Sequence, residues 1–285
     1  MHKKPLSFSQ ELLAFQAGMH GSNLMVSQYL SAEQLGISTI PMQPSVNDVL
    51  SVRVWRGAED GAFESFEVPR RASQTVLDVV THIQRCIDAT LSYRFACRVG
   101  MCGSCAMTVN GRARWTCRTH VAKVLRHPGD VLEIAPLNHL PIVKDLAVDM
   151  TQFFDKWRDA KGFFAGNRDR SAPLEQVDPA SPERQAADAG IECIGCGVCY
   201  ASCDVVGWKP DYLGPAALNR AWTLVNDVRD IQQGARHDAV ATDAGCHACH
   251  TLGSCTERCP KALAPTASIA GLKRAGRMPP KGGPR

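Results

Sequence analysis

The chain has 285 residues, enough for about two domains, and its 45% hydrophobic content is ordinary for a globular protein. Its formal net charge of +4 is too small to indicate a nucleic-acid partner. No apolar stretch approaches the ~20 residues that span a bilayer, because the longest uncharged run, Leu12–Ala32, contains several polar side chains. That run also lacks the apolar core and cleavage site of a secretory signal. The sequence therefore predicts neither a membrane helix nor an exported chain.

The first regular pattern begins after an extension over residues 1–47. From Val49, apolar residues alternate with polar ones, which predicts a half-buried strand. An acidic turn between Gly57 and Gly61 follows, and Phe63–Val68 is expected to return as a second strand.

A helix is predicted over Thr75–Asp88. Thr75 and Asp78 have the spacing of a capping box. Cys86 lies on this helix, where we expect it to be a small core residue. The apolar stripe of the helix comprises Val76, Val79, Val80, Ile83 and Ile87.

A hairpin is predicted where the Asn110-Gly111 dipeptide separates Ala106–Val109 from Arg112–Thr116, because this dipeptide favours a tight two-residue turn. Residues Val131–Ile134 add another short strand. Two strands, a helix, a cysteine-rich loop and further strands are typical of a β-grasp ferredoxin-like domain.

The predicted fold class is α+β, with two domains. Residues 48–150 form the β-grasp domain, and residues 151–180 form a linker rich in charged residues, Pro and Gly. Residues 181–272 form a mostly α-helical ferredoxin-like domain with two clusters. Residues 273–285 form a basic tail.

Eleven of the thirteen cysteines fall into three runs with the spacing of iron–sulfur ligands. Iron favours thiolates, and closely spaced cysteines let several thiolates converge from one loop. Three runs in one chain predict a relay of redox centres, and therefore electron transfer. The runs are Cys97, Cys102, Cys105 and Cys117; then Cys193, Cys196, Cys199 and Cys203; and then Cys249, Cys255 and Cys259.

The first run has the C-x4-C-x2-C spacing of plant-type [2Fe–2S] centres, and Cys117 supplies the fourth thiolate. Gly100 and Gly103 allow turns with positive φ that bring N–H groups close to sulfur.

The other two runs are interpreted together, because in two-cluster ferredoxins the fourth cysteine of a C-x2-C-x2-C-x3-C run ligates the other cluster. Leu252 stands where one further ligand would fall. Since leucine cannot bind iron, we expect that cluster to be [3Fe–4S]. The ligand sets are then Cys193, Cys196, Cys199 and Cys259 for [4Fe–4S], and Cys203, Cys249 and Cys255 for [3Fe–4S].

Two alternatives concern the cysteines. Disulfides are typical of short secreted domains, and this chain is neither short nor visibly exported. A zinc site needs four ligands around one ion, whereas the second run has the cysteine spacing of ferredoxins. Metal and sulfide analysis distinguishes zinc from iron.

Cys246 forms its own C-x2-C pair with Cys249. It is either an alternative ligand or a spectator thiol, and we favour the spectator interpretation.

Several motifs resemble those of one family, the iron–sulfur subunits of succinate dehydrogenase and fumarate reductase. The resemblance covers residues from about 49 to 273. It rests on Ser92–Arg98, Met101–Cys105, Leu146–Phe154, Tyr212–Ala217, Cys249–Thr251 and Cys255–Lys261.

The resemblance implies that the chain lies between a flavoprotein subunit carrying FAD and one or more membrane anchor subunits. Electrons would pass between that FAD and a membrane quinone through [2Fe–2S], [4Fe–4S] and [3Fe–4S] clusters. The chain itself would bind no dicarboxylate and carry no catalytic residue. It would be peripheral on the cytoplasmic face of the inner membrane, held there through its partners.

The resemblance also implies a quinone site formed by Trp208, His250 and Lys273. An indole N–H can donate to a quinone oxygen, and a histidine can relay protons. Asp204 and Val205 depart from the Pro and the small hydroxyl residue that are usual there, so we expect no hydroxyl ligand to the quinone.

The alternative function is a stand-alone multi-cluster ferredoxin, or the iron–sulfur subunit of a related soluble dehydrogenase or reductase. Trp208, His250 and the missing ligand at Leu252 argue against the stand-alone carrier.

Overall fold

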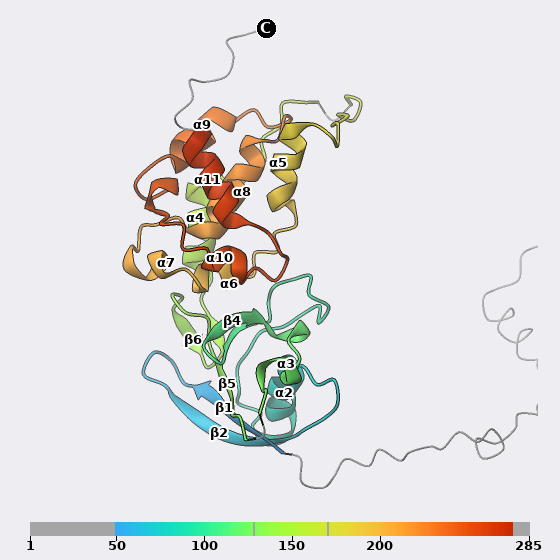
Figure 1. Ribbon diagram of the computed structural model, residues 1–285, viewed down its shortest axis with the longest axis vertical. Helices are drawn as coiled ribbons and strands as arrows, with labels where there is room; N and C mark the ends of the chain where they lie inside the picture. Colours follow the sequence, from blue (N-terminus) through green and yellow to red (C-terminus); the bar gives the residue numbers. More distant parts are fainter. Residues whose placement is uncertain (1–48, 128, 170, 276–285) are drawn as a thin grey trace, which may run out of the picture. The chain divides into compact units, whose positions relative to one another are not determined.

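The structure is a computed structural model that describes residues 49–127, 129–169 and 171–275. The expected extension over residues 1–47 and most of the basic tail lie outside the described residues. Within the described residues, the strands lie between Val49 and Val148 with short helices among them, and only helices follow (Figure 1). The expected N-terminal sheet domain and C-terminal helical domain are therefore confirmed.

Five strands form one mixed sheet in the order β2-β1-β5-β3-β4. β1 and β5 are parallel, and the other paired strands are antiparallel. Leu50, Val52 and Val54 are buried along β1, so the alternation from Val49 does reflect a half-buried strand. The strands are β1 (Val49–Arg56), β2 (Ala62–Pro69), β3 (Ala106–Val109), β4 (Arg112–Trp115) and β5 (Leu132–Ala135).

The turn between β3 and β4 has the backbone that its sequence predicts. Asn110 and Gly111 have φ values of 47° and 71°, as a tight hairpin turn requires. A short helix α3 (Val121–Val124) and a two-stranded sheet of β6 (Ile142–Lys144) and β7 (Ala147–Val148) complete the sheet domain.

Helix α2 (Val76–His82) begins at the predicted capping box. The Thr75 hydroxyl accepts from the Asp78 N–H at 3.2 Å, and the Asp78 carboxylate accepts from the Thr75 N–H at 3.0 Å. The first four residues of the apolar stripe are buried against β1 in the sheet-domain core.

The predicted stripe is wrong at the end of this helix. Residues Ile83–Ile87 form a π-helical turn, in which the Asp88 N–H donates to the Ile83 carbonyl at 2.8 Å. A π turn has more residues than an α turn, so it rotates the following side chains away from the α-helical stripe. Ile87 is consequently 48% exposed, and Cys86, expected in the core, is also exposed.

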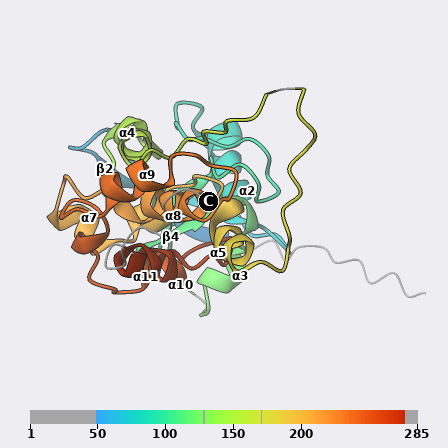
Figure 2. The ribbon, with the colours of Figure 1, turned by 90° about the horizontal axis from the view of Figure 1, so that it is seen from above.

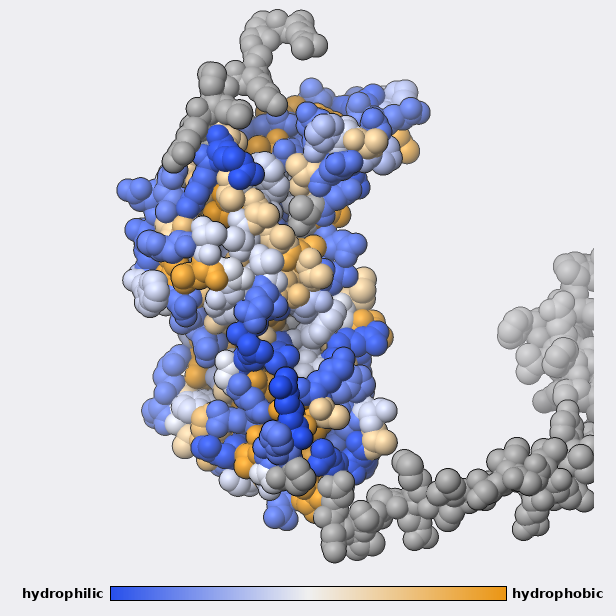
Figure 3. All heavy atoms as spheres, viewed as in Figure 1, coloured by the Kyte–Doolittle hydropathy of each residue, from blue (hydrophilic) through white to orange (hydrophobic). Residues whose placement is uncertain are grey.

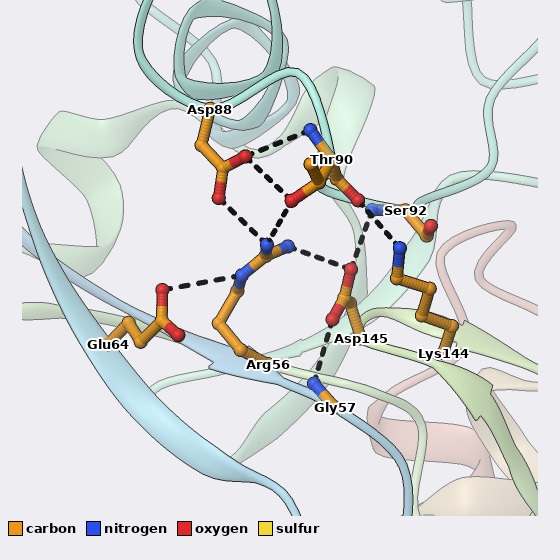
Figure 4. A network of polar contacts seen from close by, with 8 residues as sticks. All are labelled: Arg56, Gly57, Glu64, Asp88, Thr90, Ser92, Lys144 and Asp145. Atoms are coloured by element: carbon orange, nitrogen blue, oxygen red, sulfur yellow. Dashed lines mark hydrogen bonds and ion pairs between the residues drawn. The ribbon is translucent and has the colours of Figure 1, made fainter.

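A polar network around Arg56 joins the end of β1 to two later segments (Figure 4). Arg56 donates to Asp145 at 2.8 Å and to Asp88 at 2.7 Å. Asp145 is almost fully buried and also accepts from the N–H groups of Gly57 and Ser92, each at 2.8 Å. The network therefore fixes the segment that leads from Ser92 into the first cysteine run.

The helical domain is built around α8, which contacts α4, α5, α9 and α11. Figure 2 shows these helices grouped around α8. No helix in the described ranges is both long enough and apolar enough to cross a bilayer. The helices are α4 (Thr151–Asp159), α5 (Pro182–Ile191), α6 (Val198–Ala201), α7 (Asp204–Trp208), α8 (Gly214–Val225), α9 (Gln233–Val240), α10 (Ser254–Glu257) and α11 (Pro265–Ala275).

The structure differs from the sequence-based expectation in the segment assigned to the linker. Its first residues form α4, and Phe153 of that helix is buried edge-to-face on Tyr200, with ring centroids 5.5 Å apart. The aromatic side chains of this segment outweigh its charged and polar composition, since burying them stabilises a helix against the domain.

A buried ion pair holds the segment that follows α4. Arg236 donates to Asp230 at 2.7 Å, and both side chains are fully buried. Arg236 also donates to the carbonyls of Lys161 and Phe163, at 2.8 and 2.7 Å.

Hydrophilic side chains cover most of the molecular face shown in Figure 3, with scattered apolar patches, as is usual for domains with internal cores.

Candidate metal centres

The first cysteine run forms a loop whose backbone points at one sulfur. The N–H groups of Val99, Met101 and Cys102 donate to Cys97 Sγ at 3.4, 3.2 and 3.3 Å. These donors, that of Met101 first, lower the pKa of the Cys97 thiol to about 6. The loop is therefore arranged to accept negative charge on sulfur.

The other two thiols at this site are buried. Cys105 and Cys117 pack together beside Leu77 of α2. Burial, with the neighbouring Cys105 thiol, raises the pKa of Cys117 to about 11. The structure thus brings all four cysteines of the first run into one region, partly exposed at Cys97 and buried at Cys117.

The cysteines predicted to bind [4Fe–4S] line one hollow of the helical domain, with a volume of about 400 Å³ including the part open to solvent. Burial raises the pKa of Cys196 to about 12 and that of Cys199 well above its usual value. The cysteines that line the hollow are Cys193, Cys196, Cys199 and Cys259.

The other three cysteines line a second hollow, of about 320 Å³. Leu252 lines it as well and is 53% exposed. The Thr266 hydroxyl lies 3.3 Å from Cys255 Sγ, and the ring of Tyr212 is buried at the wall. Burial, with a contribution from Cys249, raises the pKa of Tyr212, so its hydroxyl stays protonated. The cysteines of this hollow are Cys203, Cys249 and Cys255.

The loop of the first cysteine run contacts the hollow that Cys193, Cys196, Cys199 and Cys259 line. Gly103 has a φ of +73°, and a Cβ built there would lie only 2.7 Å from Cys196 Cβ. Helix α6 carries Cys199, which lines the first hollow, and ends just before Cys203, which lines the second. This short helix therefore connects the two hollows. The three cysteine groups therefore follow one another through the molecule.

The donor chemistry of the hollows fits an iron–sulfur cluster. The hollows bring thiols together without a carboxylate, as soft iron requires. Among the described residues, no three His, Cys, Asp or Glu side chains meet as at a single metal ion. Cluster cysteines bind different iron atoms, and so surround a volume rather than a point. Asn219 also lines the first hollow, and its buried Nδ2 has no hydrogen-bond partner within the described part of the chain.

Comparison with known proteins gives the family. Residues 51–155 match the model of a 2Fe-2S iron-sulfur cluster binding domain, and residues 190–263 match that of a 4Fe-4S dicluster domain. The chain is 35% identical over 211 residues to the fumarate reductase iron-sulfur subunit of Mycobacterium tuberculosis, covering 74% of this chain and 84% of that protein. This chain belongs to the iron–sulfur subunits of succinate dehydrogenase and fumarate reductase.

Other relatives agree with this family. The succinate dehydrogenase iron-sulfur subunit of Paracoccus denitrificans is 36% identical over 199 residues, which cover 70% of this chain and 74% of that protein. A solved chain of the Mycobacterium smegmatis Sdh1 complex in the apo form has a TM-score of 0.69 at 24% identity, covering 80% of this chain and 95% of that chain. At that identity the likeness shows a shared fold alone.

Of the three residues that the family resemblance assigns to a quinone site, the second hollow is lined by His250 alone. Exposed His250 lines the second hollow. Trp208 is 70% exposed at the end of α7 and is not among the lining residues. Lys273 Nζ donates to the Cys249 carbonyl at 2.7 Å, so it holds the turn that carries His250.

Cys246 is fully buried in the hydrophobic core of the helical domain and lines neither hollow. Burial raises the pKa of its thiol. This position favours the spectator interpretation of Cys246.

Sequence reasoning did not identify three polar neighbours of the hollows: Asn219, Thr266 and Tyr212. Tyr212 lies in a motif of the resemblance, which is a signal of its importance. Asn219 and Thr266 have no such signal, because a polar residue inside a helical pattern is most often on the surface.

Proposed function

We propose that this chain is the electron-transfer subunit of a succinate:quinone oxidoreductase or quinol:fumarate reductase, and connects the FAD of a flavoprotein subunit with a membrane quinone. The observation that carries this proposal is the succession of three cysteine-lined sites, of which two meet at Gly103 and Cys196. When bound, each cluster would accept and release one electron at a time.

The proposed ligands follow the grouping of the thiols. The sheet order, with α2 packed on β1, supports a β-grasp ferredoxin-like fold for the first site. The two hollows support a ferredoxin-like fold for the helical domain. The proposed ligands are Cys97, Cys102, Cys105 and Cys117 for [2Fe–2S]; Cys193, Cys196, Cys199 and Cys259 for [4Fe–4S]; and Cys203, Cys249 and Cys255 for [3Fe–4S].

Leu252 decides which type of cluster we propose for the second hollow. It lines the hollow at the position where a further thiolate would complete a cubane, and its side chain offers no donor. Cys246 is buried in the core and does not line this hollow. We therefore assign [3Fe–4S] to this hollow.

The quinone partner is proposed for the surface beside the second hollow. His250 is exposed at this hollow and Trp208 is exposed at the end of α7, and aromatic side chains such as an indole are enriched at interfaces. Lys273 contributes by holding the Cys249 carbonyl. Membrane anchor subunits would cover this surface and keep the chain on the cytoplasmic face of the inner membrane.

The flavoprotein partner is proposed for the opposite end of the relay. Val99 and Met101, beside Cys97, are 53% and 62% exposed. Apolar side chains grouped around a redox loop are typical of a surface that a partner covers.

Low-temperature EPR of the complex, purified anaerobically with its partner subunits, tests the proposal. A reduced [2Fe–2S] signal and an oxidised-state [3Fe–4S] signal are expected. Zinc with little acid-labile sulfide would overturn the relay. Trp208→Leu should lose quinone turnover while keeping all three clusters; unchanged turnover would remove Trp208 from the quinone site.

A further inference from the structure

The buried amide of Asn219 is only half satisfied. Asn219 lies on α8 and is 1% exposed. Its Oδ1 accepts from the Ser268 hydroxyl at 2.9 Å. Its Nδ2 is buried and finds no hydrogen-bond partner in the described part of the chain. An unpaired buried donor destabilises a fold, so this nitrogen calls for an acceptor that the protein atoms do not supply.

The position of Asn219 indicates where that acceptor lies. Asn219, in the middle of α8, lines the first hollow together with the proposed [4Fe–4S] cysteines. A Cβ at Gly190 would lie 2.8 Å from Asn219 Nδ2, so α5 packs directly on this side chain. The Cys193 N–H donates to the Gly190 carbonyl at 3.2 Å, which joins the same contact to the first ligand of the hollow.

Ser268 occupies the oxygen end of the amide. Its hydroxyl comes from α11 and is itself buried, so it engages the Asn219 oxygen away from solvent. With the oxygen engaged, the amide presents N–H groups as its remaining hydrogen-bonding capacity. Sulfur atoms at a cluster are the acceptors that such a donor meets in a hollow lined by thiols.

We propose that Asn219 Nδ2 donates a hydrogen bond to a sulfur of the [4Fe–4S] cluster and so raises the reduction potential of that cluster. This inference rests on the proposed function. Reduction adds negative charge to the cluster, and a donor to sulfur stabilises the more negative state. The effect is strong because the site is buried, where hydrogen bonds are poorly screened by water.

Asn219→Leu, which keeps the branched shape of the side chain and removes the donor, is the decisive variant. An EPR-monitored redox titration of the purified complex should show a lower [4Fe–4S] potential. About a tenfold shift in the equilibrium between oxidised and reduced cluster is expected, or 59 mV for one electron. Thr223→Val is the matched control: its hydroxyl, on the same helix, donates to the Asn219 carbonyl instead, and the potential should stay unchanged.

The outcomes separate this inference from the proposed function. A wild-type complex without a [4Fe–4S] signal would reject the assignment of the cluster itself. A wild-type signal, with the same potential in Asn219→Leu, would reject only the hydrogen bond. If Asn219→Leu does not retain the cluster, pulsed EPR of the reduced wild-type complex with ¹⁵N-labelled asparagine side-chain amides decides. A magnetic coupling between a labelled amide nitrogen and the [4Fe–4S] cluster supports the proposal, and its absence overturns it.

Discussion

The first cysteine loop and the hollows of the helical domain prepare their thiols in opposite ways. In the loop, three N–H groups lower the pKa of Cys97 to about 6. In the helical domain, burial raises the pKa of Cys196 to about 12, and that of Cys199 also rises. The loop supports a thiolate at Cys97 before iron arrives, whereas burial opposes one at Cys196 and Cys199, as it does at Cys117 beyond the loop.

This difference in thiol pKa bears on how strongly each domain depends on bound metal for its folding. A buried thiol that must become a thiolate depends on the positive charge of iron to offset its desolvation. The helical domain therefore depends on its clusters more than the sheet domain does. The sheet domain has a separate core between α2 and β1, and the Arg56 network closes it without cysteine ligands.

Removing iron from the chain should produce the largest effect. After chelation under reducing conditions, amides of α5–α11 are expected to lose protection from hydrogen exchange, while those of β1–β5 stay protected. Hydrogen exchange with mass spectrometry resolves the two domains. An equal loss of protection in the two domains would contradict the greater dependence of the helical domain on its clusters.

Leu252→Cys tests the second hollow alone. A new thiolate at the lining position of Leu252 should convert [3Fe–4S] into [4Fe–4S] and abolish the EPR signal of the oxidised state. Cys246→Ala is the control and should keep that signal, because Cys246 lines neither hollow. If Cys246→Ala instead loses it, the spectator interpretation is wrong.

Local patterns in the sequence predicted local structure well. The Thr75–Asp78 capping box and the Asn110-Gly111 turn each depend on a few neighbouring residues, and both form as predicted. The cysteine spacings likewise grouped the thiols that line each hollow, because ferredoxin loops are short. Their assignment as ligands stays a prediction until a cluster is measured.

The misses come from contacts between distant segments or from an irregular backbone. The helical period placed Cys86 and Ile87 inside, but the π turn moved them out. Composition assigned Phe153 to a linker, but its ring packs on Tyr200, 47 positions later. Asn219 is meaningful only beside Ser268 and the cysteines, which no spacing along the chain brings together.

Gly103→Ala should weaken the contact between the first loop and the helical domain. The φ of +73° strains alanine, and its Cβ would meet Cys196 at 2.7 Å. A stability loss of about 2–5 kcal/mol is expected from strain and overpacking together. Gly111→Ala has a similar φ of +71° but open space around its Cβ, so about 1–2 kcal/mol is expected. Urea unfolding of the two variants separates the contact from the strain, and equal losses would mean that the contact contributes nothing.

The smallest effect expected is a difference in alkylation between two thiols of the iron-free protein. The thiolate is the reactive form, so Cys97, whose pKa is lowered to about 6, should react at a constant rate above pH 7 and slow below pH 6. In a helical domain loosened by iron loss, Cys199 should instead keep speeding up to at least the ordinary cysteine pKa of about 8.5. Iodoacetamide labelling at a series of pH values, followed by peptide mass spectrometry, gives both profiles. Met101→Pro removes the N–H nearest to Cys97 Sγ and should move the Cys97 profile toward higher pH. An unmoved profile would mean that this N–H does not stabilise the thiolate.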